Sequence, residues 1–303
     1  MSHHLAADAA YVADGDNLQE EVDGSCAGRD ENDFENNIIE DITAAQAKMG
    51  RDIQGIAWER LSVSRNNYRQ TRLEQYRNYE SVPRSVEVSN KESKMAEKGG
   101  SYYQFKLNSR SVKPTFLHFQ LRNLVWATSQ HDVYLTSDSS IIHWNASAGT
   151  QSEVLNVAGH VAPVEAHPGS LLEGFRQTQV STLAVKDGLL AVGGFQGELI
   201  CKHLDRPGVS FCSRLTDDVN AIVNAVEIYN CPSGVLRLTA ALNDCGVREF
   251  DVETFQETNH FRFPWPVNYT SQSPDGKLLV VVGDDTDGLL VDAQSGKVCP
   301  HCF

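Results

Sequence analysis

The chain has 303 residues and a mass of 33.5 kDa, which is long enough to bury a substantial core without disulfide support. It holds no run that approaches the roughly 18 to 20 consecutive apolar residues of a membrane span. Its first residues also lack the basic-then-apolar order of a signal peptide. We therefore expect a protein of the cytoplasm, the nucleus or both, with no membrane partner.

The formal net charge of −14 is concentrated near the N-terminus, because residues 1–60 hold 14 Asp and Glu against 4 Lys and Arg. A nucleic-acid-binding surface needs a basic footprint for the phosphates. The charge balance therefore argues against nucleic acid as a general partner.

Cysteine usage indicates a reducing compartment. The seven cysteines are odd in number, and six of them are scattered singly through apolar or loop segments without metal-ligand spacing. The terminal Cys299-Pro300-His301-Cys302 follows a β-rich segment and precedes no helix that would activate a thiol. We predict no catalytic residue, no metal site and no cofactor.

The N-terminal third is polar and divides by composition. Residues 1–40 are acidic and have few apolar positions, so we expect them to be disordered. Asp41 is predicted to cap a short helix that stops at Gly50, and residues 52–82 are predicted to form a second helix, so that 41–82 is a helical docking segment. Residues 83–101 are predicted to be a linker.

From residue 102 onward the apolar period becomes strand-like. Sixteen short runs, from FLHFQL at 116–121 to GLLVDA at 288–293, alternate with turn residues, and no long amphipathic helix lies between them. This pattern predicts an all-β fold: a sandwich, a barrel or a propeller.

Internal repeats favour a propeller. Three segments share an apolar run, a Gly or Asp turn and a second strand ending in Asp205, Asp251 or Asp292, with spacings of 46 and 41 residues. A period in the low forties with four short strands is typical of a propeller blade. At this period, residues 102–303 are predicted to form about four to five blades.

Several motifs accompany these repeats: the endings Leu204-Asp205, Phe250-Asp251 and Val291-Asp292, the dipeptide Gly159-His160, the turn Ser273-Pro274-Asp275-Gly276-Lys277, and the runs DIQGIAWERL, SVKPTFLHFQLRNLVWATSQHDVYL, GFQGELICKHLDRPGVSF and SPDGKLLVVVGD. In these motifs, over about residues 40–298, the chain resembles an uncharacterised WD-repeat (transducin-like) family found in plants and fungi. No repeat has a Trp-Asp pair, so the hydrogen-bond network typical of the family is expected to be incomplete. The resemblance implies a seven-bladed ring, of which this chain would be a C-terminally truncated part with an unpaired sheet at each end.

Six residues recur at turns and are predicted to be structural: Gly159, His160, Asp205, Asp251, Asp275 and Asp292. Five residues interleave cations with aromatic rings and are predicted to bind a partner: Arg65, Tyr68, Arg69, Arg72 and Tyr76. They suit an acidic protein or single-stranded RNA, and packing of this helix against the propeller is the alternative. The loop at 161–178 is longer than a blade connection needs, so it either carries function or simply packs.

Two classes of function follow from these features. The first is a non-catalytic protein-interaction scaffold whose protein partner the residues do not name. The alternative is an enzyme, a hydrolase or an oxidoreductase, that uses the propeller as a frame. We favour the scaffold because the strand ends carry no converging set of His, Asp and Glu. The sequence indicates no oligomeric state.

Overall fold

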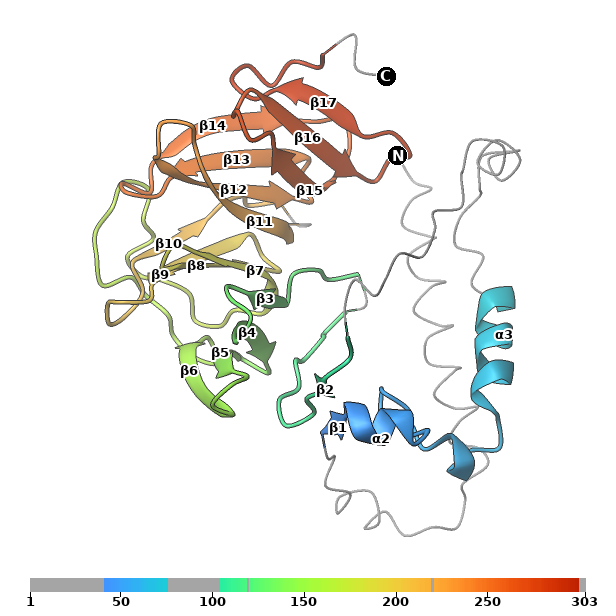
Figure 1. Cartoon of the computed structure of the whole chain (residues 1–303). Helices are drawn as coiled ribbons and strands as arrows, with labels where there is room; N and C mark the ends of the chain where they lie inside the picture. Colours follow the sequence, from blue (N-terminus) through green and yellow to red (C-terminus); the bar gives the residue numbers. More distant parts are fainter. Residues whose placement is uncertain (1–40, 76–103, 119, 219–220, 300–303) are drawn as a thin grey trace. The chain divides into compact units, whose positions relative to one another are not determined.

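The computed structural model describes residues 41–75, 104–118, 120–218 and 221–299 (Figure 1). The chain divides into two compact units, residues 1–111 and 112–303, and each is considered by itself. The predictions for residues 1–40, for the linker 83–101 and for Tyr76 lie outside the described residues. No helix within the described ranges is long and apolar enough to cross a bilayer.

In the N-terminal unit, strand β1 (Ile42–Thr43) pairs antiparallel with β2 (Leu107–Asn108), and helix α2 (Ala44–Lys48) follows β1. Thr43 is the N-cap of α2: its Oγ1 accepts from Gln46 N at 3.3 Å, and its own N–H donates to Gln46 Oε1 at 2.9 Å. The prediction that Asp41 caps this helix is wrong. Its carboxylate accepts from Arg110 N at 2.6 Å instead, because the β1–β2 pairing brings that backbone alongside.

The segment predicted as a helix over 52–82 is helical only in part. A 3-10 helix covers Trp58–Arg60, and α3 covers Arg65–Gln75. The chain before α3 turns sharply at Gly55, whose φ is +79°. Helix α3 begins after Ser64, whose Oγ accepts from Asn67 N at 3.2 Å.

The C-terminal unit consists of antiparallel sheets built from consecutive strands, which confirms the all-β class. The first sheet holds β3 (Val125–Ala127), β4 (Asp132–Ser137), β5 (Ser140–Asn145) and β6 (Thr150–Asn156). The second holds β7 (Val180–Lys186), β8 (Leu189–Gly194), β9 (Glu198–His203) and β10 (Phe211–Arg214). The third holds β11 (Val223–Asn230), β12 (Leu236–Leu242), β13 (Gly246–Asp251) and β14 (Glu257–Arg262). The fourth holds β15 (Val267–Gln272), β16 (Leu278–Gly283) and β17 (Leu289–Asp292).

The strand predicted over 116–121 is not found in the described residues. The preceding Thr115 instead contacts the first sheet through one backbone bond to Thr136 O at 2.9 Å, and Leu121 N closes a turn with His118 O. The side chains of Phe116 and Leu117 are about half exposed. Thr115 therefore bonds to β4 while the described residues after it form no strand of the sheet, which a short apolar run cannot reveal by itself.

The four sheets meet through their first strands. Strand β11 packs against β7 on one side and β15 on the other, and β3 packs against β7, while the later strands of each sheet extend outward (Figure 1). Among the strands of the described residues, no sheet closes on itself.

A β-bulge recurs one residue into three of these first strands, at Ser181, Asn224 and Asn268. The bulge turns a polar side chain toward the neighbouring sheet. Ser181 Oγ donates to Val223 O at 2.6 Å, and Asn224 Nδ2 donates to Val267 O at 2.9 Å. Each of these bonds joins the first strand of one sheet to that of the next.

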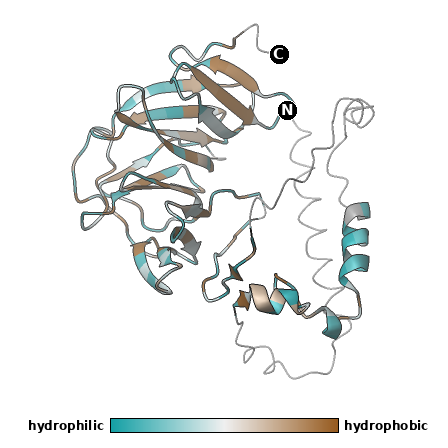
Figure 2. Ribbon diagram, in the orientation of Figure 1, coloured by the Kyte–Doolittle hydropathy of each residue, from teal (hydrophilic) through white to brown (hydrophobic). Residues whose placement is uncertain are grey.

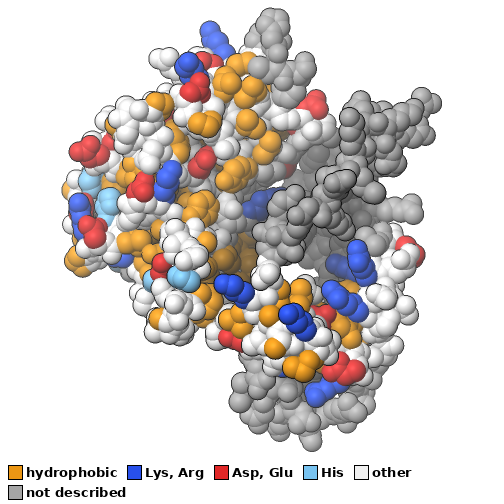
Figure 3. Space-filling view, viewed as in Figure 1, with side chains coloured by type: hydrophobic (Ala, Val, Ile, Leu, Met, Phe, Trp, Pro, Cys, Tyr) orange, Lys and Arg blue, Asp and Glu red, His pale blue; other side chains and the backbone are white. Residues whose placement is uncertain are grey.

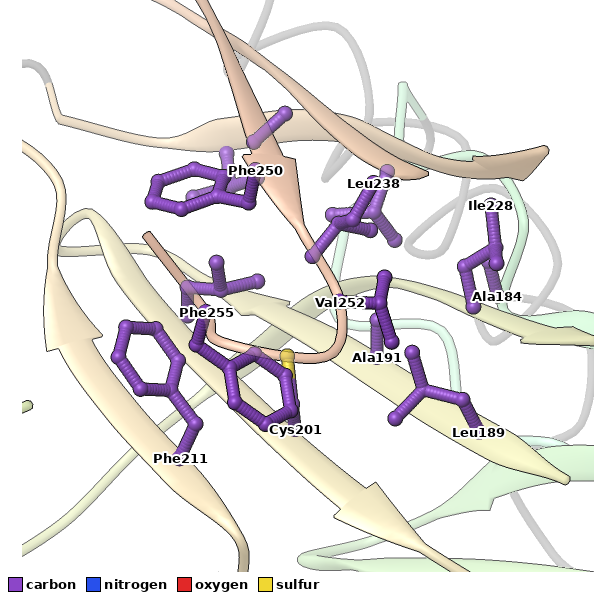
Figure 4. Close-up of a cluster of buried hydrophobic side chains, with 14 of the residues drawn as sticks. Ala184, Leu189, Ala191, Cys201, Phe211, Ile228, Leu238, Phe250, Val252 and Phe255 are labelled. Carbon is purple, nitrogen blue, oxygen red and sulfur yellow. The ribbon is translucent and has the colours of Figure 1, made fainter. Parts of the chain in front are cut away.

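Apolar clusters fill the three contacts between successive sheets. Between the second and third sheets, the rings of Phe211 and Phe255 stack with centroids 4.8 Å apart, in one cluster with Cys201, Leu189 and Leu238 (Figure 4). Strand β8 is buried along its whole length because sheets cover both of its faces. This explains why its sequence, LLAVGG, shows no alternation of apolar and polar residues.

Gly193 allows the second and third sheets to approach closely. A Cβ at this position would lie 2.6 Å from Val223 Cγ1 and 2.8 Å from Thr182 Cγ2. We expect Gly193→Val to lower the free energy of unfolding by about 2 kcal/mol through overpacking, measured by chemical denaturation. Gly159→Val is the control, since a Cβ there meets nothing within 4 Å. Equal effects of the two substitutions would contradict this interpretation.

The contact between the third and fourth sheets contains polar groups as well as apolar ones. Glu227, Thr239 and Glu249 lie opposite one another across β11, β12 and β13. Ser271 on β15 is 3.5 Å from Glu227 Oε1. Glu227 Oε2 and Thr239 Oγ1 are buried without a hydrogen-bond partner among the described residues, which is a costly arrangement for polar atoms.

Candidate functional site

The aspartates predicted to be structural lie at strand ends and turns. Asp251 Oδ1 accepts from Thr254 N at 3.0 Å, and Asp292 Oδ1 accepts from Ser295 N at 2.7 Å, so each closes the turn after its strand. Asp275 stabilises the turn between β15 and β16 by accepting from Ser273 Oγ at 2.7 Å. Asp205 lies exposed in the turn after β9.

Gly159 and His160 begin the long loop at 161–178. His160 Nε2 donates to Glu173 O at 2.6 Å, across the loop. The loop packs on the outer strand of the second sheet, where Val164 N donates to Val209 O at 2.8 Å and Leu171 N donates to Cys212 O at 2.7 Å. Packing therefore accounts for most of the loop's length.

Of the residues predicted to bind a partner, Arg65 lines a large open hollow in the N-terminal unit, which we call the arginine cavity. Its volume is about 970 Å³. Four arginines line it, together with apolar and acidic residues: Arg51, Arg60, Arg65, Arg110, Met49, Ile53, Ile56, Trp58, Asp52 and Glu59. The described residues of this unit carry eight Lys and Arg against four Asp and Glu, so this part of an acidic chain is basic.

Asp52 organises the wall of the arginine cavity. Its carboxylate accepts from Trp58 Nε1 at 2.9 Å and from Gln54 N at 2.7 Å, and lies 3.5 Å from Arg65 Nε. Burial acts to raise the pKa of Asp52, but these hydrogen bonds and the Arg65 charge together hold the pKa below its ordinary value. Asp52 therefore fixes both Trp58 and Arg65.

Arg110 reaches the cavity from the other segment of the unit. The β1–β2 pairing positions its backbone, and its guanidinium lies over Gly55, where a Cβ would collide with it. Asn108 Nδ2 also donates to Ile53 O, which ties the two segments together. The cavity thus depends on contacts between residues far apart in the sequence.

Helix α3 contributes Arg65 to the lining of the cavity and reaches Trp58 of that lining through Tyr68. The ring centroids of Tyr68 and Trp58 are 5.7 Å apart, and the Arg72 guanidinium lies 6.0 Å from the Tyr68 ring. Arg65 lines the cavity, whereas Arg69 is exposed on the helix and does not. The structure therefore brings together Arg65, Tyr68 and Arg72.

Sequence reasoning missed Arg51, Arg60 and Arg110 as lining residues. Arg51 and Arg60 flank the apolar run 53–58, so their proximity to it was readable from the sequence. Arg110 carried no local signal, because only the β1–β2 pairing brings it to this site.

A second hollow, of about 530 Å³, lies where the second and third sheets meet. Its side chains include His203 and an exposed network in which Glu165 Oε2 is 3.1 Å from His167 Nε2 and Glu165 Oε1 is 3.5 Å from Arg206 Nη1. The hydrogen bond from His167 is the main reason that the pKa of Glu165 is lowered. Within the described ranges, no three His, Cys, Asp or Glu residues are arranged to hold a metal ion.

Ser129, Asp132 and His143 lie together on the first sheet, but not in a catalytic order. Ser129 Oγ donates to Asp132 Oδ2 at 2.6 Å, and His143 Nε2 is 2.9 Å from Asp132 Oδ1. The carboxylate lies between the other two groups. In a hydrolase triad the imidazole occupies that place and takes the hydroxyl proton.

Comparison with known proteins gives no family. No protein-family model matches the chain, and no curated protein matches it. Among solved structures, it is similar to the computationally designed Ika8 protein, with 14% identity and a TM-score of 0.41 over 58% of this chain and 47% of that one. It is also similar to hydrazine synthase of Kuenenia stuttgartiensis, with 16% identity and a TM-score of 0.43 over 62% and 51% of the two chains. This chain thus spans about half the length of these solved chains.

Proposed function

We propose that this protein is a non-catalytic interaction scaffold, in which a WD-repeat-like β-propeller arrangement accompanies a docking unit for an acidic segment of a partner protein. The propeller arrangement is supported by successive antiparallel sheets that meet through their first strands. A polar residue at the same bulge position, Ser181 or Asn224, links sheet to sheet, as expected of a repeat.

The arginine cavity is the observation that carries the docking proposal. Four arginines surround apolar side chains, of which Ile53 and Ile56 remain 43% and 37% exposed. Guanidinium groups bind carboxylates through paired N–H donors, and the exposed apolar groups offer contact area to the same ligand. An acidic peptide that also carries apolar residues fits this combination.

Binding of a fluorescent deca-glutamate peptide to the full chain tests the proposal. Arg60→Glu combined with Arg65→Gln should weaken binding about tenfold, because two or three charge contacts at about 0.5 kcal/mol each are lost. Raising the salt concentration from 50 to 300 mM should weaken binding to the unaltered chain. The thermal midpoint should stay nearly unchanged.

Arg176→Glu is the control, because it makes a comparable change of charge on an exposed residue of the C-terminal unit. If it weakens binding as much as the cavity variant, the effect reflects net charge and the proposal fails. A parallel binding measurement with an oligouridylate tests single-stranded RNA as the ligand. If the RNA binds and the peptide does not, single-stranded RNA replaces the acidic protein segment as the proposed ligand.

A further inference from the structure

The fourth sheet has one covered apolar face and one uncovered apolar face. Leu279, Val281 and Val291 pack on the third sheet and are buried. Val280 and Val282 point to the opposite face and are 45% and 41% exposed. Strands β16 and β17 are apolar over much of their length in Figure 2, and Figure 3 shows hydrophobic side chains gathered over them.

The corresponding positions in the second and third sheets are covered. Counting from the bulge, Val282 occupies the place of Gly193 in β8 and Ala241 in β12. Val280 likewise occupies the place of Ala191, which is fully buried. A strand that is apolar on both faces is typical of a sheet enclosed on both sides. Strand β16 therefore has the composition of a strand enclosed between two sheets, although one of its two faces is uncovered.

Asn268 occupies the bulge position in the fourth sheet that Asn224 occupies in the third sheet, so their hydrogen bonds can be compared. Asn224 Nδ2 makes two bonds at 2.9 Å, one to Asn243 Oδ1 in its own sheet and one to the first strand of the next sheet. Asn268 Nδ2 makes the equivalent bond within its sheet, to Asp284 Oδ1 at 2.9 Å. No bond from Asn268 to a further first strand is found among the described residues. Its amide is thus placed to bond the first strand of another sheet.

The first sheet offers a matching face at the other end of the series. Its surface away from the second sheet is formed by residues that share a side of the sheet by their register: Val125, Ala127, Val133, the buried Leu135, Ile142 and Trp144, with Gln151 and Glu153 on the outer strand β6. Val125 is 46% exposed, and Val133, Ile142 and Trp144 are partly exposed. The residues of β3, β4 and β5 on this face are uncharged, and Glu153 on β6 places one carboxylate at its edge.

We propose that the uncovered face of the fourth sheet binds the uncovered face of the first sheet of a second copy of this chain, and that the second contact forms reciprocally. Each sheet has one face toward the sheet before it in sequence and one face toward the sheet after it. Each contact inside the molecule joins the second kind of face to the first kind on the next sheet. The same relation between two copies covers both apolar faces and gives Asn268 a first strand to bond. In a dimer related by a two-fold axis, the uncovered faces of the first and fourth sheets of each copy are both covered, and no apolar sheet face stays open.

The mass of the full chain in solution tests this proposal, measured by light scattering after size exclusion at tens of micromolar. The expected mass is twice that of the 33.5 kDa chain. Val280→Glu and Val125→Glu should each give a monomer with an unchanged circular dichroism spectrum, because a charge then enters both contacts. Val235→Glu is the control, since Val235 is an exposed valine in the turn before β12 and should leave the dimer intact.

Mixing the two disruptive variants gives the most specific outcome. Chains with Val280→Glu keep a normal first sheet, and chains with Val125→Glu keep a normal fourth sheet, so one of the two contacts can form between them. An equimolar mixture should therefore contain heterodimers, whereas neither variant associates alone. A monomeric unaltered chain, or a mixture that does not associate, would overturn the proposal.

Discussion

Replacing Arg248 with methionine is expected to lower the free energy of unfolding by about 3 kcal/mol, because it leaves a buried carboxylate without its counter-charge. Arg248 Nη2 lies 2.9 Å from Asp244 Oδ2, and the two side chains are only 6% and 3% exposed. Burial acts to raise the pKa of Asp244, but the hydrogen bond and charge of Arg248 hold the pKa below its ordinary value. The carboxylate is therefore kept ionised by a partner that the substitution removes.

A double-mutant cycle with Asp244→Asn separates this effect from lost packing. The double variant should recover part of the stability, because the uncompensated charge is then absent. Arg206→Met is the matched control: its 3.5 Å pair with Glu165 is exposed, so the change should cost less than about 1 kcal/mol. A loss of that small size for Arg248→Met, measured by denaturant unfolding, would contradict the argument.

Stability is also expected to fall as the pH rises from about 5 to about 8, by about 2 kcal/mol, because of Glu227. Burial raises the pKa of Glu227 from 4.5 to about 7, against smaller lowering effects from the Ser271 hydrogen bond and the Lys186 charge. The rise corresponds to about 3 kcal/mol at 1.4 kcal/mol per unit, and solvent screening at this partly exposed site reduces the expected effect.

The direction follows from which state holds the proton. Below pH 4.5 both the folded and the unfolded chain hold it, so Glu227 costs nothing. Between pH 4.5 and about 7 the unfolded chain has released the proton and the folded chain has not. Each rise in pH within this window therefore lowers the free energy of the unfolded state relative to the folded state. Above this window the cost is constant.

Glu227→Gln should remove this pH dependence and make the variant more stable than the unaltered chain at pH 8. The measurement is the free energy of unfolding from pH 5 to 8, taken as a difference between variant and parent so that other titrating groups cancel. Glu253→Gln, at an exposed turn position, should leave the pH profile unchanged. A Glu227→Gln profile parallel to that of the parent would show that Glu227 does not govern the stability.

Much of the β architecture could be predicted from the sequence, because short apolar runs between turn residues define strands locally. The runs at 180–185, 189–195 and 236–242 correspond to β7, β8 and β12. The run at 116–121 failed as a strand prediction because the same apolar pattern also suits a turn segment, such as the one that Leu121 N closes with His118 O. Thr43 rather than Asp41 capped α2 because the pairing of β1 with a distant strand decided where the helix begins.

The candidate site was predictable only in its local part. Arg65 and Tyr68 stand out from their spacing on one helix, and Trp58 belongs to the neighbouring apolar run. Arg110 and the anchoring of Asp52 depend on tertiary contacts, for which the sequence has no local signal. The buried pair Asp244–Arg248 was equally invisible, because a charged pair formed by a turn residue and the strand after it resembles an ordinary solvated pair until its burial is known.

The bulged residues Ser181 and Asn224 make each sheet's stability depend on its neighbours. Because their side chains bond to the following first strand, a sheet that opens takes a bond away from the sheet next to it. Folding free energy in such a series is held largely at nearest-neighbour interfaces. Amide protons of β8 and β12, enclosed on both sides, should therefore exchange last, while fraying begins at β3 and β17 and moves inward one sheet at a time.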